Sequence, residues 1–329
     1  MNWKNKNVLV TGIYGFFAPH IARQLVAQSA NVVGTYHDEK RHSYCAMEGI
    51  DKSITLAKLD INDIDRLSEI ISNYEIDYIF HCAANSIVRT CVSNPVGAFR
   101  ANIMGTVNVI DAAMNVGGVK GIMCMESDKS YGSFESNNLP YKETDAIRPT
   151  NVYEVSKACS GLIAQAYSYN YEMPVFTIRA ANLYGPGDMN MSRLIPGSVL
   201  RILDGRSPVL YSGVSNYVRE FLHVTDAADA AVKLMENINQ SKGNIFNIGS
   251  QSVHKISEVM EMILENMPQK MPIEIVEKDP KFKEIAEQYV DYSKLISIYP
   301  GFSPRPFEIG IKETINWYNE NFTNLPLPA

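Results

Sequence analysis

The sequence predicts an α/β fold in which one parallel sheet is covered by helices on both faces. Two features support this: strand-like and helix-like segments alternate over the first half of the chain, and a glycine-rich turn joins the first strand to the first helix. Such alternation is typical of doubly wound sheets. The expected strands are 7–11, 31–35, 53–59, 78–83, 121–125 and 175–178, and the expected helices are 20–28, 62–74, 98–116 and 153–171.

The turn after the first strand predicts a dinucleotide-binding Rossmann domain. Gly12 permits a tight turn, Gly15 lets the backbone approach a pyrophosphate, and Ala18 is small enough for the helix to pack on the strand. The free N–H groups at the helix N-terminus would bind the phosphates. A glycine motif alone is a weak signal, but this one lies between a strand and a helix at the start of the chain.

A second, smaller region is expected where the alternating pattern ends, near Leu183. Glycine and proline divide the chain into shorter elements there, as in Gly185-Pro-Gly187. We therefore expect a Rossmann domain over 1–182 and a smaller C-terminal α/β domain for the substrate over 183–329. No clean linker marks the boundary, so segments of the second part are free to return to the first.

The composition is ordinary for a globular chain of 329 residues, with a net charge of −6 and no basic block. This argues against nucleic acid and membrane surfaces as partners. No apolar run approaches the ~18 residues of a membrane span, and the chain opens into a strand rather than a signal peptide. Five cysteines and six histidines show no metal-ligand spacing, so no metal is expected, and the odd cysteine count favours a reducing, cytoplasmic setting.

Tyr153 and Lys157 predict acid/base chemistry on an alcohol, with Ser127 preceding them in the chain. Their i, i+4 spacing places both side chains on one helix face. A close ammonium group is expected to lower the pKa of the tyrosine, so that the phenol takes a proton from a hydroxyl while a hydride leaves the same carbon. Taken alone, the pair also fits a half-buried tyrosine beside a solvated lysine.

Several motifs, in their order, resemble the extended short-chain dehydrogenase/reductase superfamily of nucleotide-sugar enzymes. The resemblance covers nearly the whole chain and includes the last helix, Gly310-Ile-Lys-x-Thr314-Ile-x-Trp317-Tyr318. The other motifs are Thr11-Gly12-x-x-Gly15-Phe16, His81-Cys-Ala83-Ala84, Asn102-x-x-Gly105-Thr106, Tyr153-x-x-x-Lys157, Arg179-x-x-Asn182-x-Tyr-Gly-Pro186 and Arg219-Glu-Phe-x-His223-Val-x-Asp226.

The resemblance implies a role for each matching residue. Ser127 would hydrogen-bond the sugar hydroxyl, Tyr153 would take its proton, and Lys157 would hold the nicotinamide ribose. Near the substrate we expect Ser86, without an assigned role, and Asn182, Arg193 and Arg219 as ligands of the pyrophosphate. The residues expected at the cofactor are Gly12, Gly15, Phe16, Ala18, Tyr36, His37, Arg41, Asp60, Ile61, Ala83, Ala84, Asn102, Tyr153 and Lys157.

The Asp128-Lys129 pair after Ser127 favours one reaction of this superfamily. Epimerases and decarboxylases need no acid and base at this place, whereas 4,6-dehydratases do. Ser-Asp-Lys resembles CDP-glucose 4,6-dehydratase, which implies Asp128 as the acid for the C6 hydroxyl and Lys129 as the C5 base. The alternatives are a nucleotide-sugar epimerase, favoured by the segment 185–188, and a non-catalytic NAD(P)-binding protein. A local ion pair at a strand end would explain the two residues without catalysis.

The segment after the second strand favours NADP over NAD. An acid for a ribose 2′-hydroxyl is not obvious, because Asp38 comes late, and His37, Lys40 and Arg41 would instead meet a 2′-phosphate. A solvated loop is the alternative.

The resemblance implies a CDP-hexose as substrate, with a GDP- or other NDP-hexose as alternatives, and a homodimer. Two helices per subunit commonly form the interface in this superfamily, and here they would be 98–116 and 153–171. The second helix carries more apolar surface than one packing face requires. Cover by the C-terminal region is the alternative.

Overall fold

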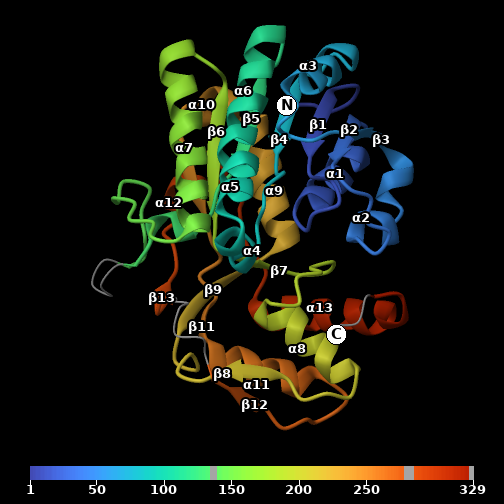
Figure 1. Cartoon of the computed structure of the whole chain (residues 1–329), viewed down its shortest axis with the longest axis vertical. Coiled ribbons are helices and arrows are strands. Elements are labelled where there is room, and N and C mark those ends of the chain that lie inside the picture. Colours follow the sequence, from blue (N-terminus) through green and yellow to red (C-terminus); the bar gives the residue numbers. More distant parts are fainter. Residues whose placement is uncertain (134–138, 278–284, 326–329) are drawn as a thin grey trace.

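The computed structural model describes residues 1–133, 139–277 and 285–325. Figure 1 shows a large sheet-and-helix region and, below it, a smaller region built mainly from the second half of the chain. The predicted fold class is confirmed: a parallel sheet with helices on both faces stands beside a smaller α/β region.

The large region is built on a seven-stranded parallel sheet with the order β10-β6-β5-β4-β1-β2-β3. Thr11 at the end of β1 pairs with Thr35 on one side and His81 on the other, so three strand ends lie level. The strands are β1 (Asn7–Thr11), β2 (Asn31–Tyr36), β3 (Thr55–Lys58), β4 (Tyr78–His81), β5 (Gly121–Met125), β6 (Val175–Ala180) and β10 (Ile245–Ile248).

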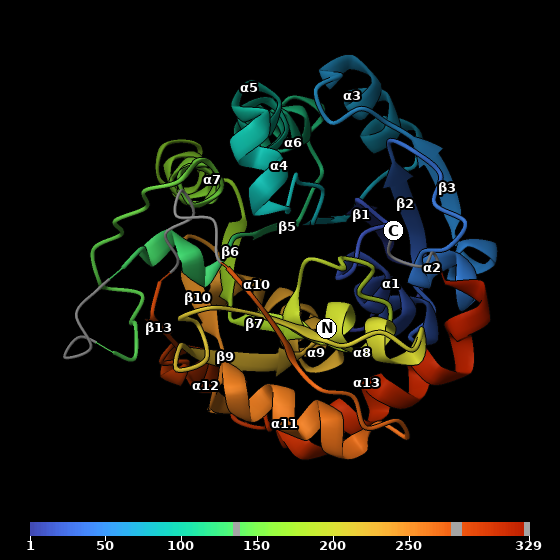
Figure 2. The ribbon, with the colours of Figure 1, turned by 60° about the horizontal axis from the view of Figure 1, so that its bottom comes forward.

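Helices cover both faces of this sheet, as Figure 2 shows from below. The alternation of side chains along β1 explains why: Leu9 packs into one buried cluster, and Val8 and Val10 pack into the other. One face carries α3 (Ile64–Asn73), α6 (Gly105–Val116) and α7 (Val152–Tyr171). The other carries α1 (Ala18–Ala27), α9 (Val224–Glu236) and α12 (Ser293–Ile298).

In the part of the chain that the structure describes, the smaller region contains two short sheets and three longer helices. One sheet joins β7 (Asn182–Tyr184), β9 (Val218–His223), β11 (Val253–Lys255) and β13 (Glu287–Gln288), and the other joins β8 (Val209–Tyr211) and β12 (Glu274–Val276). The helices are α8 (Leu194–Leu203), α11 (Ile256–Asn266) and α13 (Phe307–Asn321).

Segments from the second half of the chain return to the large region. β10 pairs with β6 at the sheet edge, and α9 packs against α1. The chain therefore crosses between the regions more than once, as an unclean boundary would allow. The division into 1–182 and 183–329 stays a prediction.

The helix expected over 98–116 differs in detail. The chain forms α5 (Pro95–Phe99), a π-helical turn over Arg100–Met104, and then α6. Such turns are frequent at functional sites, and here the turn holds Asn102, whose side chain faces the loop after β4. The remaining short helices among the described residues are α2 (Tyr44–Met47), α4 (Val88–Ser93), α10 (Ile238–Ser241) and the 3₁₀ turns 50–53, 128–131 and 322–324.

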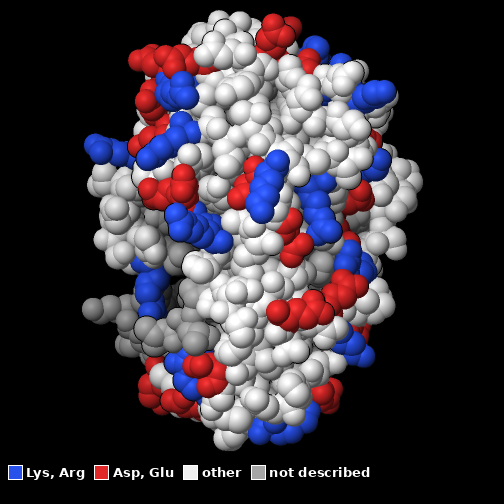
Figure 3. All heavy atoms as spheres, turned by 90° about the vertical axis from the view of Figure 1, so that its right-hand side faces the viewer, with Lys and Arg blue, Asp and Glu red and all other residues white. Residues whose placement is uncertain are grey.

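The described residues contain no helix with the length and apolar content that crossing a membrane requires. On the face drawn in Figure 3, acidic and basic side chains are interspersed rather than gathered by sign.

Candidate active site

A cleft of about 1920 Å³ opens at the carboxyl ends of the parallel strands. Its walls come from the turns after β1, β4 and β5, from the start of α7 and from α8 and β8 of the smaller region. This is where doubly wound sheets bind their ligands, because the loops diverge where the strand order reverses.

The turn after β1 fits a dinucleotide pyrophosphate. Gly12 has φ +74°, and a Cβ there would lie 2.9 Å from the Cα of Ala83, so the turn needs glycine for both conformation and space. The amide of Gly15 donates to the carbonyl of Gly12 at 2.8 Å, and α1 begins three residues later at Ala18. Phe16 also lines the cleft. The backbone therefore forms the kind of cradle that a dinucleotide needs.

The far end of the cleft is lined by Tyr36, His37, Asp60 and Ile61, as expected. Arg41 is not among the lining residues, so the structure does not support a direct contact of this side chain with a cofactor. The His37 ring lies 2.9 Å from a carboxylate oxygen of Asp38 and 4.0 Å from one of Asp60. Two carboxylates thus flank the ring that was expected to meet a 2′-phosphate.

The loop after β4 is held by side chains behind the cleft wall. The Thr11 hydroxyl accepts from the amides of Cys82 and Ala83, and Asn102 bonds both backbone groups of Asn85. Ala83 and Ala84 line the cleft as predicted. Asn102 itself is buried behind this wall and is not a lining residue, so its role at the cofactor stays a prediction. Its second amide hydrogen bond goes to the Ser156 hydroxyl on α7.

Ser127, Tyr153 and Lys157 all line the cleft. Asn151 begins α7 with a capping box that includes Glu154, which places Tyr153 in the first turn and Lys157 one turn later on the same face. The ammonium of Lys157 donates to the carbonyl of Met125 at 2.6 Å. The three side chains therefore converge from the end of β5 and the start of α7.

The pKa of Tyr153 is raised, whereas the sequence pattern predicted a lowered value. Burial raises this pKa to about 12, although a hydrogen bond with Ser127 and the charge of Arg193 act in the opposite direction. The side chain is only 9% exposed, and a phenolate there would lose most of its hydration. Lys157 is not among the groups that lower this pKa, and its ammonium donates to the Met125 carbonyl.

Asp128 and Lys129 lie in the 3₁₀ turn that follows Ser127. Asp128 is 2% exposed and lines the cleft, and one of its carboxylate oxygens has no hydrogen-bond partner among the described residues. Burial raises its pKa to about 6, against the charges of Lys129 and Arg219. The half-buried Lys129 also lines the cleft. The pair is thus part of the cavity rather than only a surface ion pair.

The expected substrate residues all line the cleft, but from different elements. Ser86 lies in the loop after β4, Asn182 begins β7, and Arg219 lies on β9. Arg219 donates to the carbonyls of Val218, Ala286 and Ile285. Arg193, directly before α8, forms an ion pair with Asp188 at 2.9 Å. The smaller region therefore brings two cations to the cavity.

A model of the NAD dependent epimerase/dehydratase family matches residues 8–249. The chain belongs to this family.

Relatives in this family differ in the reaction that they catalyse. A trifunctional UDP-glucose 4,6-dehydratase/UDP-4-keto-6-deoxy-D-glucose 3,5-epimerase/UDP-4-keto-L-rhamnose-reductase of Arabidopsis thaliana is 29% identical over 96% of this chain. The chain spans about half of that relative, 47% of its length.

Two solved structures share the fold over almost their whole length. DesIV, a dTDP-glucose 4,6-dehydratase from Streptomyces venezuelae with NAD and TYD bound, is 26% identical with a TM-score of 0.86, covering 97% of this chain and 98% of that one. A UDP-N-acetylglucosamine 4-epimerase from Methanobrevibacter ruminantium, in complex with UDP-N-acetylmuramic acid, is 27% identical with a TM-score of 0.85, covering 97% and 99%. The resemblance seen in the motifs is thereby confirmed at the level of the family.

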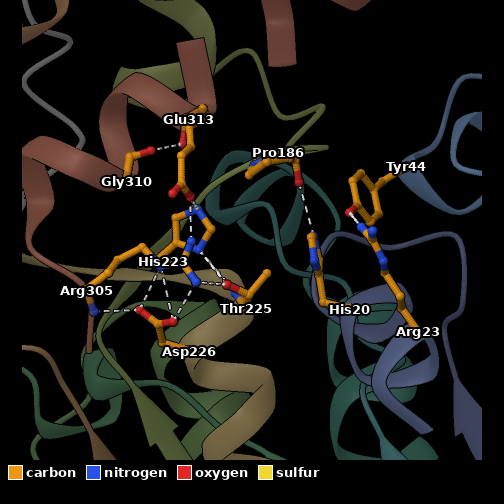
Figure 4. A network of polar contacts seen from close by, with 11 residues as sticks. His20, Arg23, Tyr44, Pro186, His223, Thr225, Asp226, Arg305, Gly310 and Glu313 are labelled. Atoms are coloured by element: carbon orange, nitrogen blue, oxygen red, sulfur yellow. Dashed lines mark hydrogen bonds and ion pairs between the residues drawn. The ribbon is translucent and has the colours of Figure 1, made fainter. Parts of the chain in front are cut away.

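A polar network that the motifs did not predict connects segments that are far apart in the sequence (Figure 4). Arg305 donates to both carboxylate oxygens of Asp226 on α9 and pairs with Glu313 on α13. His223 lies 2.8 Å from the hydroxyl of Thr225 in the same cluster. Because these residues come from distant segments, the network ties α13 to the N-terminus of α9.

A second set of contacts reaches the loop that holds Arg193. His20 on α1 lies 3.1 Å from the carbonyl of Pro186 (Figure 4), and the Tyr318 hydroxyl donates to the carbonyl of Asp188 at 2.6 Å. Asp188 was not among the predicted site residues. Its position five residues before Arg193 matches no helical or strand spacing, so only the folded loop shows their pairing.

Proposed function

We propose that the protein is a nucleotide-sugar 4,6-dehydratase that converts an NDP-hexose to an NDP-4-keto-6-deoxyhexose. The observation that supports this best is the buried Asp128 carboxyl, whose unpartnered oxygen lies in the cleft wall beside Ser127. A carboxyl group with a pKa near 6 holds its proton at neutral pH more often than an ordinary aspartate does, which suits a general acid.

The cradle around Gly12 fits a nicotinamide dinucleotide, with Ala83 and Ala84 along its wall and Lys157 toward the nicotinamide ribose. When bound, the cofactor would take the hydride from C4 of the sugar and return it to C6. We infer NAD rather than NADP, because Asp38 and Asp60 flank His37 and a 2′-phosphate would be repelled by both carboxylates. The NAD in the DesIV structure supports this choice.

The residues of this chain then move the protons. Ser127 holds the C4 hydroxyl, and Tyr153 in its phenolate form takes the proton of this hydroxyl as the C4 ketone forms. The ketone makes the C5 hydrogen acidic, and Lys129 removes it as a proton. Asp128 protonates the C6 oxygen, which leaves as water and creates the C5–C6 double bond. The proton on Lys129 returns to C5 when C6 is reduced. The proton that Tyr153 took is released to solvent and Asp128 is reprotonated from solvent, so the net change is the loss of one water.

Charged side chains on the opposite wall suit the substrate pyrophosphate. Arg193 and Arg219 line the cleft, and so does Asn182, which begins β7 directly after β6. We propose a pyrimidine nucleotide, because Ser-Asp-Lys resembles CDP-glucose 4,6-dehydratase and the Arabidopsis relative and DesIV are named for UDP- and dTDP-sugars. Of the hexose we propose only that it carries a free C6 hydroxyl.

A nucleotide-sugar 4-epimerase is the second candidate, favoured by Gly185-Pro-Gly187-Asp188 and by the similar Methanobrevibacter epimerase. Incubation with NAD and a panel of CDP-, UDP-, dTDP- and GDP-hexoses separates the two. A dehydratase yields a product that has lost one water, and an epimerase yields an isomer of unchanged mass. Neither product from any member of the panel would reject both functions.

We also propose a homodimer through α5–α6 and α7. Val96, Met104, Leu162 and Tyr169 on these elements are about half exposed or more, although each is apolar or aromatic. Apolar surface of this kind commonly marks a protein interface. Light scattering should give twice the chain mass of 36.8 kDa, and a monomer at micromolar concentration would contradict the proposal.

A further inference from the structure

Glu126 is a buried carboxylate at the centre of the candidate active site. It lies between Met125, whose carbonyl accepts the Lys157 ammonium, and Ser127. The side chain is fully buried and forms an ion pair with Arg179 at 2.9 Å, and the Arg179 side chain is 3% exposed. A charge in such a place is costly unless it interacts with other charges.

The carboxylate also lies against the face of α7 that carries Lys157. Gly161 follows Lys157 by four positions and therefore lies on the same face of the helix. A Cβ at Gly161 would overlap the second carboxylate oxygen of Glu126. The missing side chain thus leaves room for the carboxylate beside α7, on the Lys157 face.

The other titratable groups that act on Lys157 carry no charge at neutral pH. Burial raises the pKa of Cys82, directly after β4, and of Cys124 on β5 to about 12, and it lowers the pKa of His81 on β4 to about 3. From α4, burial also raises the pKa of Cys91. Glu126 is the one carboxylate in this set. Burial lowers the pKa of Lys157, and Glu126 acts against that shift more strongly than the cysteines.

Arg179 on β6 keeps Glu126 from being an isolated anion. Its guanidinium carbon lies 4.7 Å from the ring centroid of Tyr131, and burial raises the pKa of this phenol to about 12, so the ring stays neutral. Burial raises the pKa of Glu126 as well, whereas the charges of Arg179 and Lys157 lower it. The Glu126 carboxylate therefore forms an ion pair with Arg179 and also acts electrostatically on the buried Lys157.

We propose that Glu126 is a positioning residue whose carboxylate keeps the buried Lys157 side chain protonated and docked on the Met125 carbonyl. This rests on the proposed function, in which the charged Lys157 holds the nicotinamide ribose. Glu126 acts through Lys157 and need not contact the substrate.

The direct test is the titration of Lys157, followed by NMR in protein labelled with ¹³C-lysine and assigned with Lys157→Met. Glu126→Gln keeps the shape of the side chain and removes its charge, so the titration midpoint of Lys157 should fall by about one pH unit or more. Glu220→Gln is the matched control, because Glu220 is also buried but accepts from the amides of Ser250, Gln251 and Val290. It should leave the midpoint of Lys157 in place.

The double variant Glu126→Gln/Arg179→Gln keeps the test valid if Glu126→Gln does not fold, because it removes both buried charges. Its midpoint for Lys157 should lie between those of Glu126→Gln and the wild type. The alkaline limb of the pH profile for C4 oxidation should shift to lower pH together with the Lys157 midpoint. A purely structural role of Glu126 would not cause this shift. A Lys157 midpoint that is unchanged in both variants would overturn the inference. If Glu126→Gln does not fold, an unchanged midpoint in the double variant would overturn it. A wild type that oxidises no nucleotide hexose would reject the proposed function, while the titration would still decide the effect of Glu126 on Lys157.

Discussion

The two sides of the cleft are built from different parts of the chain. The dinucleotide side is mostly backbone. The Gly12 turn lies close to Ala83, and the Thr11 hydroxyl accepts hydrogen bonds from two amides of the loop after β4. The substrate side depends on charged side chains. Arg219 donates to Ala286, far along the chain, and Arg193 pairs with Asp188, whose carbonyl is held by Tyr318. A local turn specifies the first side, whereas the complete fold is needed to specify the second.

The largest expected effect is at Tyr153, where the two sides meet. Tyr153→Phe removes the hydroxyl that takes the C4 proton, so C4 oxidation should fall by ~10²–10⁴-fold while the cofactor still binds. Cofactor absorbance after mixing with substrate measures this step. Tyr141→Phe is the control, because that buried hydroxyl donates to the Gly132 carbonyl outside the cleft and its loss should cost only ~1 kcal/mol of stability. Wild-type oxidation by Tyr153→Phe would reject the mechanism.

A substitution in the glycine turn tests the backbone side. Gly12→Ala places a Cβ 2.9 Å from the Ala83 Cα at a positive φ, so the turn must open and NAD affinity should fall at least ~10-fold. Gly49→Ala is the matched control, since Gly49 has a similar φ of +67° but nothing within 4 Å. It should lower the unfolding temperature without weakening NAD binding. Equal losses of NAD affinity in both variants would show that backbone strain, and not the contact with Ala83, causes the loss.

This contrast explains which parts the sequence could predict. Gly12, Gly15 and the Tyr153–Lys157 pair are contiguous or one helical turn apart, so local rules place them correctly. The strand and helix ends of the first half are also set by local apolar runs, and most agree within about two residues with the expected ranges. The pairing of β10 with β6 depends on a long crossover, which no local pattern encodes.

The errors concern partners rather than positions. The i, i+4 spacing places Lys157 beside Tyr153, but it does not reveal that the ammonium reaches the Met125 carbonyl and that burial dominates the pKa of the phenol. Asn102 was expected to line the cleft, but it lies in a π-helical turn and its amide is directed to the backbone of Asn85. Such details depend on packing between elements far apart in the sequence.

The polar network of Arg305, Asp226 and Glu313 should contribute to the free energy of unfolding. Arg305→Met leaves Asp226 without its bidentate partner in a partly buried place, so the free energy of unfolding should drop by ~1–3 kcal/mol. Arg66→Met is the control, because the Arg66–Glu69 pair is exposed and should contribute below ~0.5 kcal/mol. Urea unfolding of both variants measures the difference. Similar small losses would mean that the network does not hold the regions together.

Acid should lower the free energy of unfolding because buried histidines must take up protons. Burial lowers the pKa of His20, His81 and His223 to about 3, whereas each takes up a proton below about 6.5 in the unfolded chain. The unfolded state binds more protons between these values, so stability is full above about pH 6.5 and falls as the pH drops. The slope is at most ~1.4 kcal/mol per pH unit for each histidine. A flat unfolding temperature between about pH 7.5 and 5.5 would contradict this.

The central claim is that Asp128 and Lys129 carry out elimination after C4 oxidation, and exchange of the C5 hydrogen in deuterated water tests it most directly. With the nucleotide hexose that the wild type accepts, Lys129→Met should reduce the cofactor, lose C5 exchange and form no 4-keto-6-deoxy product. Asp128→Asn should keep the exchange and also stop at the 4-keto hexose, because an amide cannot protonate the C6 oxygen. Full dehydration by Lys129→Met would contradict the account and favour the epimerase.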